Sequence, residues 1–170
     1  MSLLEHKKQA EKTVCCKVIT VSDTRNEETD KSGRLMIELL EHAGHTVSDY
    51  VIVKDSSKEI QEEIEKACAR TEIDVILTNG GTGIAKRDVT IEAVKGLLEK
   101  EMVGFGEIFR MLSYQEDIGS AAILSRAIAG VLKNKAIFST PGSSGAVKLA
   151  MNRLILPEIG HITTELKKNL

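Results

Sequence analysis

Short apolar strands alternate with amphipathic helices along the first half of the chain, and this alternation constrains the fold more than any other feature. The β-branched run 15–21 precedes a helical pattern over 33–43, and the strand-like run 45–53 precedes a helix that opens at a capping box beginning with Ser56. A third run, 74–78, is nearly continuous in apolar character, as in a parallel strand covered on both faces. Because parallel strands need crossover helices between them, the pattern predicts an α/β fold.

The C-terminal half departs from simple alternation. The apolar runs 127–132 and 136–139 flank only three residues, a spacing short enough for a hairpin, so one antiparallel strand is expected in the sheet. After a Pro141-Gly142 turn, apolar residues recur at helical spacing from Val147 to Ile155. We therefore expect a three-layer α/β sandwich, with a mostly parallel sheet, one antiparallel strand and helices on both faces.

Length and charge limit the classes of protein that remain. The 170 residues carry 23 Lys+Arg against 25 Asp+Glu, and only two Tyr, three Phe and no Trp. This length fits one domain over 14–170 behind a polar N-terminal tail over 1–13. A near-neutral chain with few aromatics lacks the basic face and the stacking platforms of nucleic-acid binders. No apolar run approaches a membrane span or a signal peptide, so we expect a cytoplasmic protein without a membrane or nucleic-acid partner. Three cysteines, two of them adjacent, predict neither a disulfide framework nor a zinc site.

Polar residues follow the three predicted parallel strands at the point where each strand ends. Ser22 and Asp23 follow the first strand, Asp55 the second, and the loop Gly80-Gly81-Thr82-Gly83 with Asp88 behind it the third. Ligands bind at this edge of open α/β sheets, because loop amides converge there. Glycines let those amides approach an anion closely, although this loop matches neither standard phosphate motif. Carboxylates facing a phosphate would repel it unless Mg²⁺ bridged them, an apparatus typical of phosphoryl or nucleotidyl transfer.

Each of these residues also has a purely structural explanation. The glycines could make only a tight turn, Asp88 could cap the following helix, and Asp23 and Asp55 could be turn residues. Their shared location favours a functional site. Ser143 at the start of the last helix and Ser125-Arg126, which would add a cation, are further candidates for ligand contacts. The alternatives are an ordinary helix cap for Ser143 and a solvated or ion-paired surface position for Arg126.

Five segments carry a resemblance to a known family. In chain order they are Val21-Ser22-Asp23, Thr78-Asn79-Gly80-Gly81-Thr82-Gly83, Arg87-Asp88-Val89-Thr90, Gly104-Phe105-Gly106-Glu107 and Pro141-Gly142-Ser143. Together they resemble the MoaB/MogA family of molybdenum cofactor biosynthesis proteins, and more closely its MoaB branch. The resemblance extends from about Val14 to Glu158. Asn79 and Gly145 depart from residues that are common in the family, Thr or Ile in the first case and Lys in the second.

The resemblance implies an activity, an assembly and a set of site residues. The implied reaction is adenylylation, in which the terminal phosphate of molybdopterin attacks the α-phosphate of ATP in the presence of Mg²⁺ and releases pyrophosphate. Asp55 and Asp88 match the acids associated with Mg²⁺ and the transfer, so we expect them to be catalytic. Implied partners are other molybdenum cofactor biosynthesis proteins and copies of the chain itself, as a trimer or hexamer. The alternative is a protein that binds or delivers molybdopterin without catalysis. The remaining predicted ligand-binding residues are Ser22, Asp23, Gly80, Gly81, Thr82, Gly83, Glu107, Ser125 and Ser143.

The stretch Ile118 to Leu132 also predicts assembly. It holds many small and aliphatic residues around a single charge, Arg126, which is typical of an association surface. The alternative is that the whole stretch belongs to the core.

Overall fold

A six-stranded sheet forms the centre of the computed structural model, which describes residues 2–8, 13–168 and 170. The strand order is β2-β1-β3-β6-β5-β4. β1 pairs in parallel with β2 and β3, β3 pairs in parallel with β6, and β5 runs antiparallel to both of its neighbours. The predicted mostly parallel sheet with one antiparallel strand is therefore confirmed, and a short edge strand that was not predicted, β4, borders it. The strands are β1 (Cys15–Val21), β2 (Thr46–Val53), β3 (Val75–Asn79), β4 (Lys100–Glu101), β5 (Ile128–Leu132) and β6 (Lys135–Thr140).

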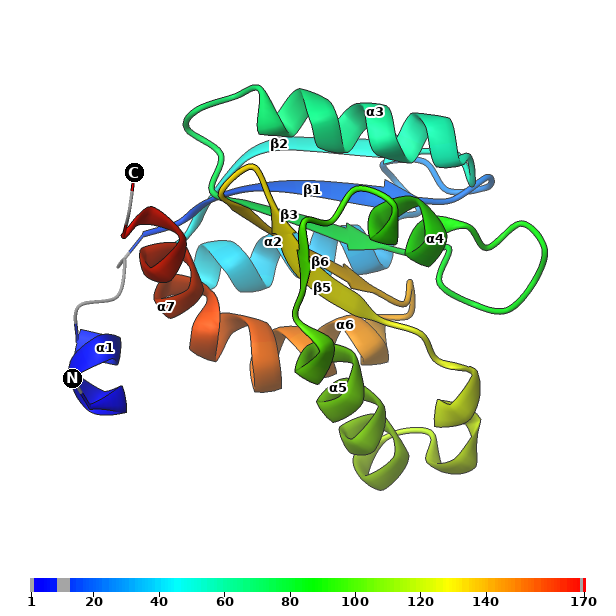
Figure 1. Cartoon of the computed structure of the whole chain (residues 1–170). Coiled ribbons are helices and arrows are strands. Elements are labelled where there is room, and N and C mark those ends of the chain that lie inside the picture. Colours follow the sequence, from blue (N-terminus) through cyan, green and yellow to red (C-terminus); the bar gives the residue numbers. More distant parts are fainter. Residues whose placement is uncertain (1, 9–12, 169) are drawn as a thin grey trace.

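Helices cover both faces of the sheet, which confirms the three layers (Figure 1). On one face lie α3 (Ser57–Cys68) and α4 (Thr90–Lys95). On the other face lie α2 (Lys31–His42), α5 (Val103–Glu116), α6 (Ser144–Ala150) and α7 (Leu156–Lys167). The 3₁₀-helix η1 (Gly119–Leu124) follows α5, and the π-helical turn η2 (Met151–Ile155) joins α6 to α7. Among the described helices, none has the length and hydropathy needed to cross a membrane.

The N-terminal segment that was expected to be a polar tail contains a short helix, α1 (Leu3–Lys8). In Figure 1 this helix lies to one side of the sheet. Residues 1 and 9–12 of the expected tail lie outside the described residues.

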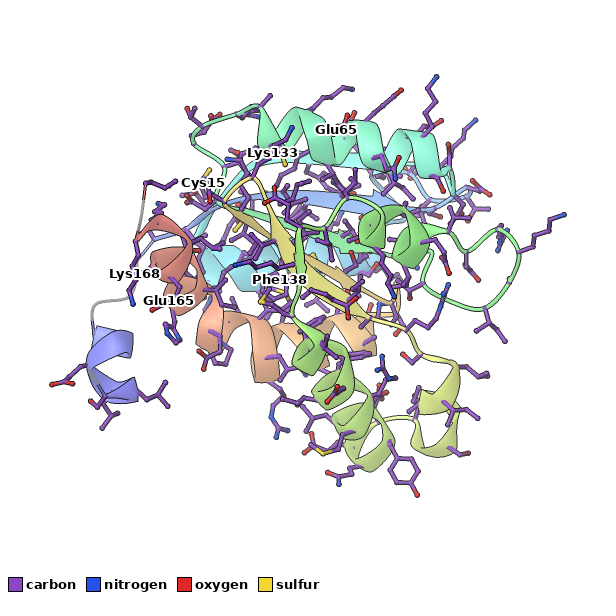
Figure 2. The ribbon with its side chains drawn as sticks, viewed as in Figure 1. Cys15, Glu65, Lys133, Phe138, Glu165 and Lys168 are labelled. Carbon is purple, nitrogen blue, oxygen red and sulfur yellow. The ribbon has the colours of Figure 1, made fainter. Side chains whose placement is uncertain are left out.

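Two apolar cores lie against the two faces of the sheet. Met36 and Phe109 belong to the core beneath α2, α5 and α6, whereas Ile64 belongs to the core beneath α3 and α4. Cys16 is buried in the first core and Cys15 packs against the second, as expected for adjacent residues of one strand. Phe138, labelled on β6 in Figure 2, lies in the first core, where its ring meets that of Phe105 edge-on at 5.3 Å.

The hairpin between β5 and β6 has the predicted tight turn. Lys133 and Asn134 adopt φ of 49° and 60°, the left-handed pair that a two-residue type I′ turn requires. This turn reverses the chain, so that β6 lies parallel to β3 with Thr140 opposite Asn79. The carboxyl ends of β1, β2, β3 and β6 therefore meet at one edge of the sheet, and the loop after β3 extends outward there (Figure 1).

Candidate active site

A cavity of about 520 Å³ lies at the carboxyl edge of the parallel strands, and we call it the carboxyl-edge cavity. Its volume suits a small-molecule ligand. A neighbouring hollow of about 420 Å³ shares Ser22, Asp23 and Arg25 with it and extends along the end of β2. The two hollows are therefore continuous at this edge. The residues that line the carboxyl-edge cavity are Val21, Ser22, Asp23, Thr24, Arg25, Asp55, Gly80, Gly81, Thr82, Gly83, Arg87, Asp88, Ile118, Ala121, Leu124, Ser125, Pro141 and Gly142.

Two of the predicted site residues lie outside this cavity. Glu107 is exposed on α5 and does not line it. Ser143 is the N-cap of α6, where its hydroxyl accepts the amide of Ala146 at 3.2 Å. Ser143 follows Pro141 and Gly142, which do line the cavity. A ligand contact by Glu107 or Ser143 therefore stays a prediction.

The glycine loop makes a turn that only glycine fits. Gly80 and Gly81 have φ of +97° and +68°. A Cβ on Gly80 would come within 2.2 Å of the carbonyl oxygen of Val21, and a Cβ on Gly81 would come within 2.3 Å of Thr90 Oγ1. The loop is thus held tightly between the end of β1 and the start of α4. Gly80 itself donates to the carbonyl of Thr140 at 3.0 Å, which ties the loop to β6.

Four successive amides follow Gly80 in the loop. Within the described part of the chain, the amides of Gly81, Thr82, Gly83 and Ile84 donate no hydrogen bond to another protein group. Successive unpaired amides in a glycine turn bind anions. Arg87 adds a positive charge at the same cavity. These free donors and the nearby cation are features that an anion site requires, and anion binding by the loop stays a prediction.

Three carboxylates lie around this loop. The backbone amide of Asp55 donates to Asp23 Oδ1 at 3.0 Å, so the ends of β1 and β2 are in contact. Burial raises the pKa of Asp55, and the negative charges of Asp23 and Asp88 raise it further, while a backbone hydrogen bond from Asp23 and the charge of Arg87 offset part of the effect. The protein therefore holds like charges together, a feature common at functional sites.

Asp88 does not cap the helix that follows it. The N-cap of α4 is Val89, which makes no side-chain cap hydrogen bond. Asp88 Oδ2 instead accepts the amide of Ala85 at 3.0 Å, which folds the loop back on itself. The helix-cap explanation for Asp88 is therefore wrong.

The donor set at this edge fits Mg²⁺ brought in with a phosphate ligand. Among the described residues, no group of three or more His, Cys, Asp or Glu side chains is placed to hold a metal ion. Mg²⁺ is usually held by one or two carboxylates, with substrate phosphates and water completing its shell. Asp55 and Asp88 both line the cavity and supply hard oxygen donors, and the negative charge of Asp88 contributes to the raised pKa of Asp55.

A buried polar network supports the opposite side of the cavity. The guanidinium of Arg25 donates to Ser32 Oγ at 2.6 Å and to the carbonyl of Gly142 at 2.8 Å, and it lies 3.6 Å from the fully buried Asp30. Asp30 also accepts the hydroxyl of Tyr50. Arg25 thus links the loops that follow β1 and β6. The contact with Gly142 leaves no local pattern, because the two residues lie 117 positions apart along the chain.

One side of the cavity is apolar, and its residues were not predicted to line a site. Ile118, Ala121 and Leu124 come from η1 and the turn before it, and they close one side beside Ser125. The sequence assigned them only to a stretch expected to mediate assembly. A side of this kind suits the flat face of a heterocyclic ligand.

Comparisons with known proteins agree with the fold and with the resemblance seen in the sequence. Residues 17–161 match a family described as "Probable molybdopterin binding domain". The chain is 66% identical over 168 residues to molybdenum cofactor biosynthesis protein B of Bacillus anthracis, covering 99% of each chain. The tungsten cofactor synthesizing protein MoaB from Pyrococcus furiosus has 42% identity and a TM-score of 0.84, covering 94% of this chain and 100% of that one. A molybdopterin biosynthesis Mog protein from Mycobacterium ulcerans has 25% identity and a TM-score of 0.80, covering 90% and 99%.

Proposed function

Since the chain belongs to the MoaB/MogA family of molybdenum cofactor biosynthesis proteins, we propose that it binds molybdopterin and adenylylates it with Mg-ATP, releasing pyrophosphate. The observation that carries this proposal is the pairing of the glycine loop with the two carboxylates Asp55 and Asp88; the loop amides from Gly81 to Ile84 have no acceptor among the described residues. The loop amides suit phosphate oxygens, and the two carboxylates suit the metal ion that accompanies a phosphate ligand. The second hollow beside the cavity offers space for a second substrate.

The residues of the chain would act mainly by alignment. The amides of the loop from Gly81 to Ile84 would hold phosphate oxygens, and Arg87 would offset their charge. Bound Mg²⁺ would supply charge neutralisation for the phosphate oxygens in transfer. A phosphate oxygen of molybdopterin forms the new bond to the α-phosphorus as the bond to pyrophosphate breaks. Because that oxygen is already anionic, no strong general base is required, in agreement with a cavity lined by no histidine or cysteine among the described residues.

The test is pyrophosphate release by purified protein supplied with molybdopterin, Mg²⁺ and ATP. Asp88→Asn should lose at least about 100-fold in turnover while it retains molybdopterin binding, because the isostere keeps the loop hydrogen bond to Ala85 and removes the charge for the metal. Asp117→Asn is the matched control, since Asp117 is exposed and lies outside the cavity. Binding of molybdopterin without pyrophosphate release by the parent protein would favour a binding or delivery role.

We also propose that the protein forms a homo-oligomer, a trimer or hexamer, that works with other molybdenum cofactor biosynthesis proteins. The predicted association stretch divides in two. Its second part is the buried strand β5, whereas Ile118, Ile123 and Leu124 in its first part are 46%, 83% and 50% exposed. Met111 and Tyr114 on α5 extend the exposed apolar surface.

Light scattering of the parent and of Ile123→Lys tests this assembly. The variant should have a smaller mass at equal concentration, because a charge in the centre of a buried interface is costly. Leu4→Lys, at an apolar position on α1 that is 73% exposed, is the control and should leave the mass unchanged. A monomeric parent would overturn the proposal.

A further inference from the structure

We propose that Arg126 is a positioning residue that holds the glycine loop in its anion-binding shape, and that Glu92 holds Arg126 in place. The inference deepens the proposed function and rests on it for its effect on turnover. Its structural part concerns the shape of the loop and can be tested without any substrate.

The contacts of Arg126 reach three carbonyls of one loop. Its Nε donates to the carbonyl of Thr82 at 3.0 Å, and its Nη2 donates to those of Gly83 at 2.7 Å and Asp88 at 3.4 Å. On its other side the guanidinium forms a hydrogen-bonded ion pair with Glu92 of α4, with Nη2 and Oε2 at 3.3 Å. One planar side chain therefore joins both ends of the segment 82–88 to a neighbouring helix.

The direction of these bonds matters for the opposite edge of the loop. In a planar trans peptide the carbonyl and the amide of the next residue point in opposite directions. When Arg126 binds the carbonyls of Thr82 and Gly83, the amides of Gly83 and Ile84 must point away from the guanidinium. These are two of the amides that have no acceptor within the described chain. Arg126 thus fixes the carbonyl side of two peptides and leaves their amide side available for an anion.

The rest of the loop has little else to hold it. Within the segment 82–88, the other described hydrogen bonds join only Ala85 and Asp88 to each other. Ile84 at the tip is 69% exposed and contributes little burial. Charge-assisted hydrogen bonds are stronger than neutral ones, so the guanidinium supplies the main restraint. A lysine would place a point charge there and could not bind three carbonyls and a carboxylate with one planar fork.

Arg126 itself does not line the carboxyl-edge cavity, although its neighbours Leu124 and Ser125 do. It therefore acts from behind the loop and not as a ligand contact. Its charge is also balanced by Glu92, so the cavity does not rely on Arg126 as a free cation.

The first test uses limited trypsin digestion of the whole protein without ligand. Lys86 and Arg87 lie within the loop, and cutting after either one requires the loop to open. Arg126→Met should be cut there at least about tenfold faster than the parent, because it loses the charge-assisted hydrogen bonds to all three loop carbonyls. Arg153→Met is the matched control, because Arg153 forms a similar exposed ion pair with Glu116 outside the cavity. Equal cutting rates in the parent and both variants, with fragments identified by mass, would overturn the proposal.

A second variant protects the test against misfolding. Glu92→Gln keeps the arginine but removes the charge that holds it, so its cutting rate should lie between those of the parent and Arg126→Met. If circular dichroism shows that Arg126→Met is unfolded as a whole, the cutting rate of Glu92→Gln alone decides the test. An unchanged rate in Glu92→Gln would then refute the role of the pair.

The second test separates positioning from simple loss of stability. In the pyrophosphate assay, Arg126→Met should raise KM for molybdopterin about tenfold and leave kcat within about twofold, since a loop that is only partly ordered reduces apparent affinity. Added guanidinium ion at a few tens of millimolar should restore KM, whereas the same concentration of sodium should not. A parental KM in Arg126→Met would refute positioning. No pyrophosphate release by the parent would refute the proposed function, and the trypsin result would still decide the loop restraint.

Discussion

Replacing Gly80 by alanine should reveal how closely the glycine loop approaches β1. The residue has φ of +97°, and an added Cβ would lie 2.2 Å from the carbonyl oxygen of Val21. Gly44 provides a matched reference, since its φ is +89° and a Cβ there would have no neighbour within 4 Å. The two substitutions therefore share the backbone strain and differ in the steric contact.

The expected magnitudes follow from this difference. A left-handed alanine costs ~1–2 kcal/mol, and the reduced freedom of the unfolded chain returns ~0.4–1 kcal/mol, so Gly44→Ala should lose about 1 kcal/mol of unfolding free energy. Contact with a backbone oxygen, which cannot rotate away, adds ~1–3 kcal/mol of overpacking, so Gly80→Ala should lose roughly 2–4 kcal/mol. At this chain length each kcal/mol corresponds to about 2–4 °C in Tm.

Urea titrations at one fixed protein concentration measure both losses, because an oligomer would otherwise add a concentration dependence. Gly80→Ala should also weaken molybdopterin binding in calorimetry, since relief of the contact moves the loop or the end of β1, whereas Gly44→Ala should bind as the parent does. Equal losses of unfolding free energy in the two variants would refute the close approach to Val21.

Three further outcomes follow from charges in the structure. Because the pKa of Asp55 is raised in the folded protein, its ionised carboxylate lowers the free energy of unfolding at pH 7. Asp55→Asn should therefore raise the urea midpoint at pH 7. The difference in midpoint between variant and parent should vanish as the pH falls below the ordinary carboxyl range, where Asp55 is protonated in both the folded and the unfolded state. In the pyrophosphate assay, the double variant Asp55→Asn with Asp88→Asn should raise the activation free energy by less than the sum of the two single increases. Full additivity would show that the two acids act separately. Lys17 is buried beside Glu63 at 2.7 Å and Asp49 at 3.1 Å, so Lys17→Met should cost ~3–5 kcal/mol of unfolding free energy in a urea titration, and a loss below about 1 kcal/mol would contradict this reading.

The parallel part of the sheet could be predicted because its signals are local. Each strand is a short β-branched run, and the N-cap of α3 is Ser56, whose hydroxyl accepts the amide of Glu59 as in one half of a capping box. The hairpin could be predicted from spacing alone. These features depend on residues within a few positions of one another.

Helix α5 could not be predicted from the same kind of signal. Gly104 and Gly106 lower its helix propensity, and its apolar residues lie on both the buried and the exposed sides, as Phe109 and Met111 show. In the structure, Gly106 has a packing role, since a Cβ there would lie 2.7 Å from the carbonyl of Ala127. That reason exists only once α5 has met the start of β5.

The candidate site divides in the same way. The gathering of Ser22, Asp23 and Asp55 followed from the rule that parallel strands end at one edge. The contacts of Arg25 and Arg126 could not be predicted, because they join residues 117 and 43 positions away along the chain. Long-range closure of this kind leaves no local pattern in the sequence.

The place of β6 within the sheet has a consequence for how the protein is made. β6 lies between β3 and β5, although its residues leave the ribosome about 60 positions after those of β3. Until then, β3 is an open edge whose five residues are all buried in the finished protein, and such edges invite pairing with other chains. The anchor of the glycine loop, from Gly80 to Thr140, also forms only at that moment. A nascent chain that stops before residue 140 thus lacks both the complete β3–β6 pairing and the anchor of the glycine loop.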